Sequence, residues 1–257
     1  MNEQSKTPQA KTHELFSGKS AQYARSSLLT DRENLARVKE LTGISPDDLV
    51  LDVATGTGYM AAVAAEAGAF VVATDFTLNM LLETRRELER WNKNTLALVD
   101  ADHLAFADCS FNVVACRVSV HHFANPGIAI REMARVCKTG GTVMIMDVVS
   151  SEDRAKSDLH NKMGQLRDPS EVRQWQLSEI EQMMISAGLT ITDTETWSHV
   201  MAFDEWIRLG GADSQTAEQL REMMIDSIEG DKAGINPHFV DDELHFTWTT
   251  GILVASK

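Results

Sequence analysis

The segment Asp48-Leu49-Val50-Leu51-Asp52-Val53-Ala54-Thr55-Gly56-Thr57-Gly58 joins an apolar run to a glycine-containing turn. The run at residues 49–53 has the composition of a buried strand, and the two glycines let the backbone take positive φ and approach a ligand that a Cβ would exclude. Residues 59–67 are rich in alanine and predict a helix, whose first backbone N–H groups point toward the end of the strand. This order indicates a site for a nucleotide or another small anionic ligand.

The same alternation of strand and helix continues along the chain. Strands are predicted at residues 70–74, 95–99, 111–116 and 142–148, and helices at 78–91 and 126–137. Residues 70–73 and 143–146 are apolar without a break, as in parallel strands that helices cover on both faces. We therefore predict an α/β fold with a doubly wound, Rossmann-like, seven-stranded and mainly parallel sheet.

The segments outside this alternation define the expected domain organisation. Residues 1–12 are polar and predict a disordered tail, and residues 13–257 are expected to form one domain with its cofactor-binding core at 45–150. Further helices are predicted at 28–42, 153–166, 178–187, 203–209 and 214–228, with a strand at 189–197. Because ligands of open α/β sheets bind beyond the carboxyl ends of the strands, we expect segments 13–44, 151–175 and 200–240 to be helical lid and substrate elements.

Composition narrows the class of protein. The 257 residues are 43% hydrophobic, and 24 basic against 38 acidic side chains give a net charge of −14. This charge, without a basic stretch, argues against nucleic acid and anionic membranes as partners. No apolar run has the length of a membrane span and no apolar leader is present, so a cytoplasmic protein is expected. Three scattered cysteines, Cys109, Cys116 and Cys137, predict reduced packing residues rather than disulfides or a metal site.

The glycine turn alone fits two classes of cofactor. Gly56-x-Gly58-x-x-Ala61 satisfies the dinucleotide fingerprint, with alanine as its third small residue. Asp75 ends the next predicted strand, where a carboxylate accepts hydrogen bonds from ribose hydroxyls in either class, or caps the following helix. A short-chain dehydrogenase needs Tyr-x-x-x-Lys, and neither Tyr23 nor Tyr59 has a lysine four positions on. Dehydrogenases with other catalytic groups stay possible.

Four motifs in sequence order resemble the class I S-adenosylmethionine-dependent methyltransferases of the ubiquinone-biosynthesis-like "type 11" group. Residues 52–58 are similar to the acidic-x-Gly-x-Gly-x-Gly loop, with Ala54 in place of the first glycine. Residues 99–106 resemble Gly-Asp-Ala-x-x-Leu-Pro-Phe, residues 110–114 resemble Ser-Phe-Asp-x-Val, and residues 135–141 resemble Arg-Val-Leu-Lys-Pro-Gly-Gly. The resemblance spans about residues 45–150, and it implies that the last strand, 245–255, inserts antiparallel between the fifth and sixth.

The resemblance also implies a set of cofactor contacts. The 54–58 loop would lie under the methionine part of S-adenosylmethionine, with Asp52 near the amino group and Asp75 on the ribose. Alanine in place of the first glycine is tolerable in this loop if the φ of Ala54 is negative. Asp100, with the backbone of Ala101, would bind adenine, because a carboxylate accepts from the adenine amino group. The expected cofactor-binding residues are Tyr23, Asp52, Ala54, Thr55, Gly56, Gly58, Asp75, Phe76, Met80, Asp100, Ala101, Asp102 and Arg117. Tyr23 is expected to close over the cofactor or to pack the first helix, and Phe76 and Met80 to line the site or the core.

Residues 117–123 follow the fourth strand, where the family places residues near the transferable methyl group. An imidazole with its ordinary pKa of about 6.5 is a free base at neutral pH, so His121 is the candidate catalytic residue. Adjacent side chains diverge, so at most one of His121 and His122 is expected to face the cavity; a purely structural role is the alternative. Arg167 and Asp168 are candidate lid residues, and they are expected to form an exposed ion pair rather than a substrate clamp.

The sequence thus predicts an S-adenosylmethionine-dependent methyltransferase that produces S-adenosylhomocysteine. The methyl group would pass by direct displacement to a small, neutral or hydrophobic acceptor. Two alternatives stay open, namely an NAD(P)-dependent oxidoreductase on a similar sheet and an S-adenosylmethionine-binding protein without catalysis. The segments after Ser150 contain no motif that identifies the acceptor or the atom that receives the methyl group.

Overall fold

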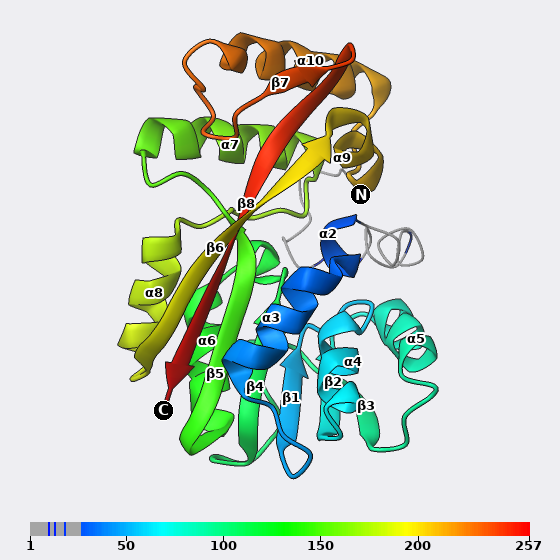
Figure 1. The fold of residues 1–257 in the computed structure, drawn as a ribbon, viewed down its shortest axis with the longest axis vertical. Helices are drawn as coiled ribbons and strands as arrows, with labels where there is room; N and C mark the ends of the chain where they lie inside the picture. The colour runs from blue at the N-terminus through cyan, green and yellow to red at the C-terminus, as the bar shows by residue number, and fades with distance from the viewer. Residues whose placement is uncertain (1–9, 11–12, 14–17, 19–26) are drawn as a thin grey trace.

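The computed structural model describes residues 27–257 together with Ala10, His13 and Gly18. At its centre is one sheet with the order β3-β2-β1-β4-β5-β8-β6, to which the short β7 is added by pairing with β8 (Figure 1). The strands are β1 (Leu49–Val53), β2 (Phe70–Asp75), β3 (Asn94–Leu98), β4 (Phe111–Arg117), β5 (Cys137–Val149), β6 (Thr190–Ala202), β7 (His238–Val240) and β8 (Glu243–Ser256).

The strand directions agree with the predicted sheet. Strands β1 to β5 pair in parallel, and β8 lies antiparallel between β5 and β6. The expected antiparallel last strand between the fifth and sixth is therefore confirmed. One strand beyond the seven predicted is present: β7, which has three residues and pairs with the start of β8.

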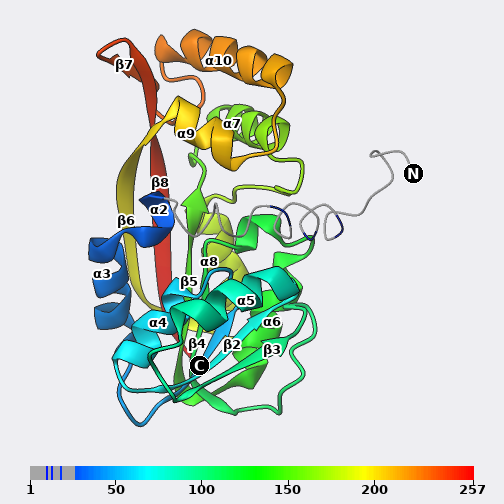
Figure 2. The same cartoon turned by 90° about the vertical axis from the view of Figure 1, so that its right-hand side faces the viewer.

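Helices cover both faces of the sheet (Figures 1 and 2). They are α2 (Ser27–Thr30), α3 (Arg32–Thr42), α4 (Tyr59–Glu66), α5 (Leu78–Glu87), the single turn η2 (Val120–His122), α6 (Pro126–Val136), α7 (Arg154–Arg167), α8 (Leu177–Ser186), α9 (Phe203–Leu209) and α10 (Ser214–Ile228). Buried side chains of α6 and α8 form a core with one face of the sheet, and those of α3 and α4 form a core with the other. The alternation of buried strand and amphipathic helix thus builds the doubly wound layers.

The predicted helix at 28–42 is divided in two at Asp31. The Asp31 carboxylate accepts hydrogen bonds from the backbone N–H groups of Glu33 and Asn34, so it caps the start of α3. Aspartate at this position satisfies backbone donors that lack a partner within the helix, which favours a new helix start over continuation. Gly43 ends α3 with φ 61, as the sequence predicts.

Strands β6 and β8 extend well past the rest of the sheet and carry the second helical insertion (Figure 1). Their far ends pack with α7, α9 and α10 in a separate cluster, which contains Val148, Met163, Met201, Phe203, Trp206, Leu220, Met224, Ala233, Ile235, Leu244, Phe246 and Trp248. The strand predicted at 189–197 ends too early, because pairing with β8 continues β6 as far as Ala202, opposite His245. The extended ends of β6 and β8 thus give the helical insertions a hydrophobic core of their own, separate from the two cores on the faces of the sheet.

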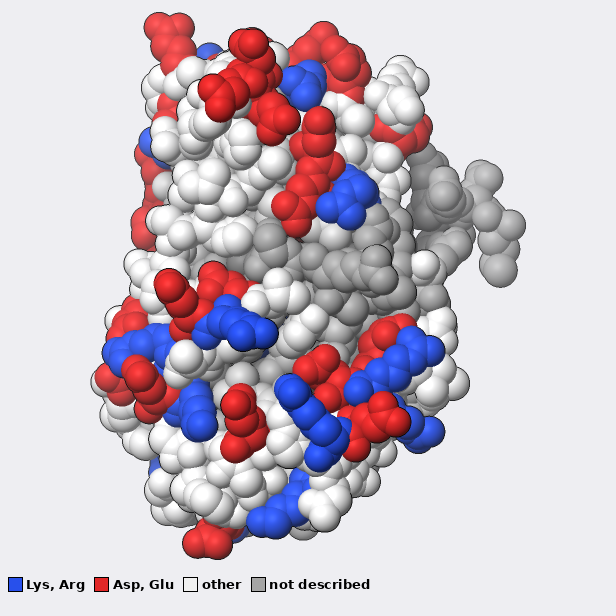
Figure 3. Space-filling view, turned by 45° about the vertical axis from the view of Figure 1, so that its right-hand side comes forward, with Lys and Arg blue, Asp and Glu red and all other residues white. Residues whose placement is uncertain are grey.

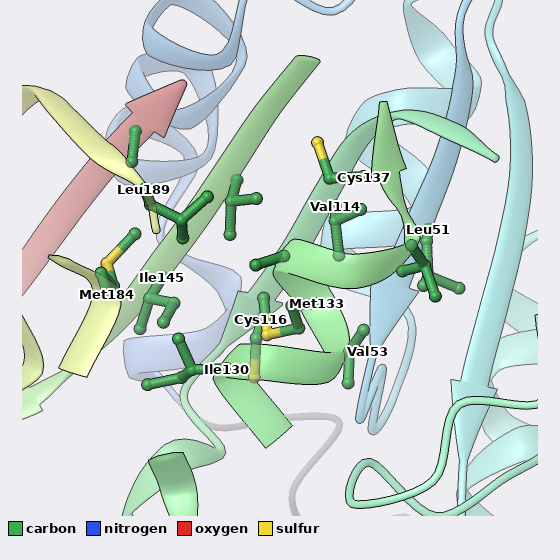
Figure 4. Close-up of a cluster of buried hydrophobic side chains, with 14 of the residues drawn as sticks. Leu51, Val53, Val114, Cys116, Ile130, Met133, Cys137, Ile145, Met184 and Leu189 are labelled. Carbon is green, nitrogen blue, oxygen red and sulfur yellow. The ribbon is translucent and has the colours of Figure 1, made fainter. Parts of the chain in front are cut away.

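Two of the three cysteines pack in the main core. Figure 4 shows Cys116 and Cys137 among Val114, Met133 and neighbouring apolar side chains. Cys109 is exposed, so the expectation of a packing role is wrong for that residue. All three thiols are free of disulfides.

The surface and the helices bear on possible partners. On the face drawn in Figure 3, lysine and arginine side chains are interspersed with aspartate and glutamate, and no continuous basic surface is visible. Within the described part of the chain, no helix combines the length and apolar character needed to cross a membrane. The described residues also contain no group of His, Cys, Asp and Glu side chains arranged to hold a metal ion.

Candidate functional site

A pocket lies at the carboxyl ends of β1, β2 and β4. It brings together twelve of the residues that the sequence singles out: Asp52, Ala54, Thr55, Gly56, Asp75, Phe76, Met80, Asp100, Ala101, Asp102, Arg117 and His121. They come from successive strand ends, which meet at one edge of a parallel sheet. The sequence interpretation is therefore supported by one continuous cavity rather than by scattered positions.

Among the described residues, one expected cofactor residue, Gly58, does not belong to this lining. Gly58 has φ 91, and a Cβ there would lie 3.0 Å from both Cα and Cγ2 of Thr84. A glycine at this position permits the close approach of α4 to α5, and the expected cofactor contact of Gly58 stays a prediction. Tyr23 lies outside the described residues.

Two residues of the pocket have strained backbones. Ala54 has φ 53, so the condition of a negative φ for alanine in this loop is not met, and the β-branched Val118 has φ 54. Their conformations are held by hydrogen bonds, because the Ser119 hydroxyl donates to the Ala54 carbonyl oxygen at 3.1 Å and the Val118 N–H donates to the Met146 carbonyl oxygen at 2.7 Å. Strain of this kind costs about 1–3 kcal/mol per residue and concentrates at functional sites.

The strain at Ala54 predicts that Ala54→Gly stabilises the protein. Relief of a left-handed alanine is worth about 1–2 kcal/mol, and the added freedom of glycine in the unfolded chain offsets about 0.4–1 kcal/mol of it. We expect the free energy of unfolding, measured by urea denaturation, to rise by about 0.5–1 kcal/mol. The matched control, Ala64→Gly inside α4, should lower it by about 1 kcal/mol or more. Equal losses in both variants would contradict the argument.

Asp75 joins the end of β2 to the glycine turn. Its Oδ2 accepts the Gly56 N–H at 3.0 Å, and its Oδ1 accepts the Thr77 N–H at 2.8 Å, just before α5. The two roles considered from the sequence, ligand contact and helix cap, are thus compatible. Burial raises the pKa of Asp75 to about 6, and the backbone donors limit the rise. Asp75 is a buried carboxylate that faces the cavity and shapes its floor.

Asp52 and Arg117 are two buried residues of opposite charge that also line the pocket. The Asp52 Oδ2 accepts from the Thr55 hydroxyl at 2.5 Å, and burial raises the pKa of Asp52 to about 7. Arg117, at the end of β4, is also buried, which lowers its pKa to about 10, and the charge of Asp52 opposes that shift. Opposite charges therefore compensate each other at the base of the pocket.

The turn after β3 lines the pocket next to Asp75, because the Val99 N–H donates to the Asp75 carbonyl oxygen at 3.0 Å. The Asp100 Oδ1 accepts the Asp102 N–H at 3.0 Å, which fixes the turn and places Asp100 and Ala101 on the lining. Phe76 and Met80 line the adjoining side, and the ring of His13 lies 6.1 Å from that of Phe76. This part of the pocket is therefore lined by carboxylates and by apolar side chains.

His121 lines the pocket and is held in place by Asp147. Its Nδ1 lies 2.6 Å from Oδ1 of Asp147, and its backbone N–H donates to Oδ2 of the same carboxylate at 3.0 Å. Burial alone would lower the pKa of His121, but the charge and hydrogen bond of Asp147 outweigh it and raise the pKa. With Nδ1 engaged, Nε2 is the ring nitrogen left for a ligand.

Both histidines line the pocket, so the expectation that at most one faces it is wrong. The tight turn η2 sets the rings of His121 and His122 with their centroids 4.1 Å apart. The His122 Nδ1 lies 3.2 Å from the Ser170 carbonyl oxygen. Burial and the neighbouring His121 lower the pKa of His122 to about 4, which keeps that ring neutral.

Arg167 and Asp168 do not form the exposed ion pair expected from the sequence. The side chains of Arg167, Asp168 and Glu171 are only 5%, 0% and 1% exposed, and the Arg167 Nη2 lies 3.6 Å from Asp168 Oδ2 and 3.3 Å from Glu171 Oε2. The guanidinium also lies over the rings of Trp206 and Trp248, at 5.3 and 5.9 Å from their centroids. A buried charged cluster therefore contributes Arg167 and Glu171 to the wall of the pocket.

Gln174 completes this wall. Its Nε2 donates to Glu171 Oε1 at 2.8 Å, and its backbone is held by Asn161 through two hydrogen bonds of 2.7 and 3.1 Å. Among the described residues, neither the Gln174 Oε1 nor the Trp248 Nε1 has a hydrogen-bond partner, although both side chains are buried and line the pocket. The signal that sequence reasoning missed is the run of polar residues from 167 to 174 between two helices.

Comparisons with known proteins agree with this geometry. The family described as "Methyltransferase domain" matches residues 51–145. The uncharacterized methyltransferase YcgJ of Bacillus subtilis is 29% identical over 212 residues, which cover 80% of this chain and 82% of that protein. The uncharacterized protein YafE of Escherichia coli is 33% identical over 139 residues, or 53% of this chain and 67% of that one. The demethylmenaquinone methyltransferase of Clavibacter sepedonicus is 33% identical over 137 residues, 52% of this chain and 56% of that one.

A solved structure shows that the similarity extends over most of the fold. A putative methyltransferase from Bacillus halodurans superposes with a TM-score of 0.83 at 26% identity, covering 88% of this chain and 99% of that one. The chain belongs to the class I S-adenosylmethionine-dependent methyltransferases of the type 11 group. It is a methyltransferase enzyme with S-adenosylmethionine as its cofactor, which sets aside the oxidoreductase and the non-catalytic binder.

Proposed function

We propose that this pocket holds S-adenosylmethionine on the glycine turn and a small-molecule acceptor against the opposite wall. The observation that carries the proposal is that a single cavity is lined by both halves, with Asp52 and Asp75 on one side and His121, Glu171 and Gln174 on the other. A donor and an acceptor bound in one cavity react without a diffusional encounter, which is a large part of catalysis in group transfer.

The residues present fit the cofactor. Among the described residues, Asp52 Oδ1 has no hydrogen-bond partner, so it can accept from the amino group of the methionine part. Asp75 would accept from the ribose hydroxyls, and Asp100 with the Ala101 N–H would bind adenine. The remaining proposed contacts are Ala54, Thr55, Gly56, Phe76, Met80, Asp102 and Arg117. When bound, the cofactor supplies a methyl group activated by the sulfonium.

The helical insertions are proposed as the lid over this reaction. Leu29 of α2, Gln174 after α7 and Leu209 of α9 all line the pocket, so each of the segments 13–44, 151–175 and 200–240 contributes a side chain. Val148, Leu209 and Trp248 add apolar surface on the acceptor side. These walls support a small acceptor with an apolar body in a chamber that excludes water.

The test is thermal unfolding of the purified protein with S-adenosylmethionine, S-adenosylhomocysteine or NAD(H). A ligand of the native state at 100 times its Kd adds about 2.7 kcal/mol of stability. We expect both sulfur ligands to raise Tm and NAD(H) to leave it unchanged. Stabilisation by NAD(H) without stabilisation by the sulfur pair would rule the proposal out. Radiolabelled methyl transfer to a panel of small acceptors then identifies the acceptor.

A further inference from the structure

We propose that the methyl acceptor has an apolar body and a hydroxyl or amine nucleophile that still carries its proton, that His121 takes this proton, and that Gln174 binds a donor group of the acceptor. This inference rests on the proposed function of the pocket and adds the class of substrate. It makes His121 the catalytic residue and Asp147 its positioning residue.

One contact to the ring and three to the backbone hold His121 in place. Asp147 binds both its Nδ1 and its backbone N–H, and the His121 carbonyl oxygen accepts from the N–H groups of Val172 and Arg173 at 2.9 and 3.1 Å. A carboxylate on Nδ1 favours the tautomer with the proton on that nitrogen, which leaves the lone pair of Nε2 as a base. A ring held in this way can receive a proton without first reorienting.

The surroundings also stabilise the charged form that results. The titratable groups that face His121 are Asp147 from β5, His122 from η2, and Asp168 and Glu171 from the segment after α7. Three carboxylates favour an imidazolium, whereas His122 is neutral and does not oppose it. These charges raise the pKa of His121 although burial lowers it.

Gln174 supplies the second point of recognition. Because a carboxylate only accepts hydrogen bonds, the Gln174 Nε2 must face Glu171, so its Oε1 points elsewhere. That buried oxygen has no partner among the described residues, and leaving such a group unsatisfied costs about 1–3 kcal/mol. A ligand O–H or N–H removes this cost, which favours acceptors that carry a donor over purely apolar ones.

The proposed step balances as follows. The proton of the acceptor hydroxyl or amine moves to Nε2 of His121, and the electron pair of that oxygen or nitrogen forms the bond to the methyl carbon. The electron pair of the broken carbon–sulfur bond stays on sulfur. A nucleophile without a proton to give gains nothing from this arrangement.

The first test measures binding to the protein saturated with S-adenosylhomocysteine, with three probes that share one ring: phenol, benzylamine and toluene. We expect phenol or benzylamine to bind at least about tenfold more tightly than toluene, the effect of one net hydrogen bond. In Gln174→Met this advantage should fall below about threefold while toluene binds as before. Thr250→Val is the matched control, because Thr250 also has a buried oxygen without a partner among the described residues but does not line the pocket.

The outcomes separate this inference from the proposed function. If S-adenosylhomocysteine does not bind, the proposed function itself fails. If it binds but neither phenol nor benzylamine exceeds toluene, whether all bind equally or none binds, the inference is overturned. A loss of the preference in Thr250→Val as well would also overturn it, since the effect would then be unrelated to the pocket.

The second test reads the protonation of His121 by nitrogen NMR of histidine-labelled protein, with the signal assigned by His121→Gln. We expect a pKa above the ordinary value of about 6.5 and, in the neutral ring, the proton on Nδ1. Asp147→Asn should lower this pKa without changing the affinity for S-adenosylhomocysteine. A neutral ring with its proton on Nε2 would overturn the role of His121, because that nitrogen could not accept another.

Discussion

Replacement of Arg167 by methionine should lower the free energy of unfolding by about 3–5 kcal/mol, the cost of removing one partner from a buried ion pair. The Arg167 guanidinium lies 3.6 Å from Asp168 Oδ2 and 3.3 Å from Glu171 Oε2, and all three side chains are almost fully buried. Methionine keeps an apolar stem against Trp206 and Trp248, so packing is largely retained. The loss therefore reports the uncompensated carboxylates.

The measurement is urea denaturation of the wild type and two variants. Arg154→Met is the matched control, because Arg154 lies in the same helix, α7, and its pair with Asp158 at 3.7 Å is exposed. Exposed pairs contribute about 0–1 kcal/mol, so the control should change stability by no more than that. Similar losses in both variants would show that the Arg167 cluster does not depend on its buried charge.

Replacement of Asp75 by alanine should raise the Kd for S-adenosylhomocysteine by at least about 100-fold. Two hydrogen bonds from ribose to a carboxylate are worth about 1.5–3 kcal/mol each, and the larger part of this is lost with the side chain. The change also frees the Gly56 and Thr77 N–H groups that Asp75 holds, which loosens the glycine turn. Both effects weaken binding.

Isothermal titration calorimetry checks this prediction. Asp108→Ala is the control, since Asp108 is exposed, pairs with Arg135 at 2.7 Å and lies outside the pocket lining; its affinity should be that of the wild type. Because burial raises the pKa of Asp75 to about 6, binding by the wild type should also weaken as the pH falls through that value. A loss of less than about threefold in Asp75→Ala would exclude Asp75 as the ribose ligand.

The proposed cofactor half of the pocket is local in the sequence, which explains why its residues could be predicted to lie together. Asp52, Asp75 and Asp100 each follow an apolar run that forms a parallel strand, and the carboxyl ends of such strands share one edge of the sheet. The features of this half that the sequence did not show are conformational. The φ of Ala54 and the packing of Gly58 against Thr84 depend on contacts that a local pattern does not contain.

The acceptor half could not be predicted in the same way. Arg167 is a surface-type residue in isolation, and it becomes buried because α9 and the distant strand β8 bring Trp206 and Trp248 over it. Asp147 is one residue among the apolar positions of β5, and its contact with His121 arises from the pairing of β4 with β5. Burial and pairing of this kind are properties of the assembled layers.

The sequence by itself determined the doubly wound sheet and the cofactor edge, because hydrophobic runs, glycine turns and strand-end carboxylates act over a few residues. The tertiary structure decided that the His121 imidazole is held by Asp147, that the Arg167 cluster is buried, and that Gln174 is left with an unpaired oxygen among the described residues. These facts depend on which distant segments exclude water from a side chain, and exclusion of water sets both its pKa and its need for a partner.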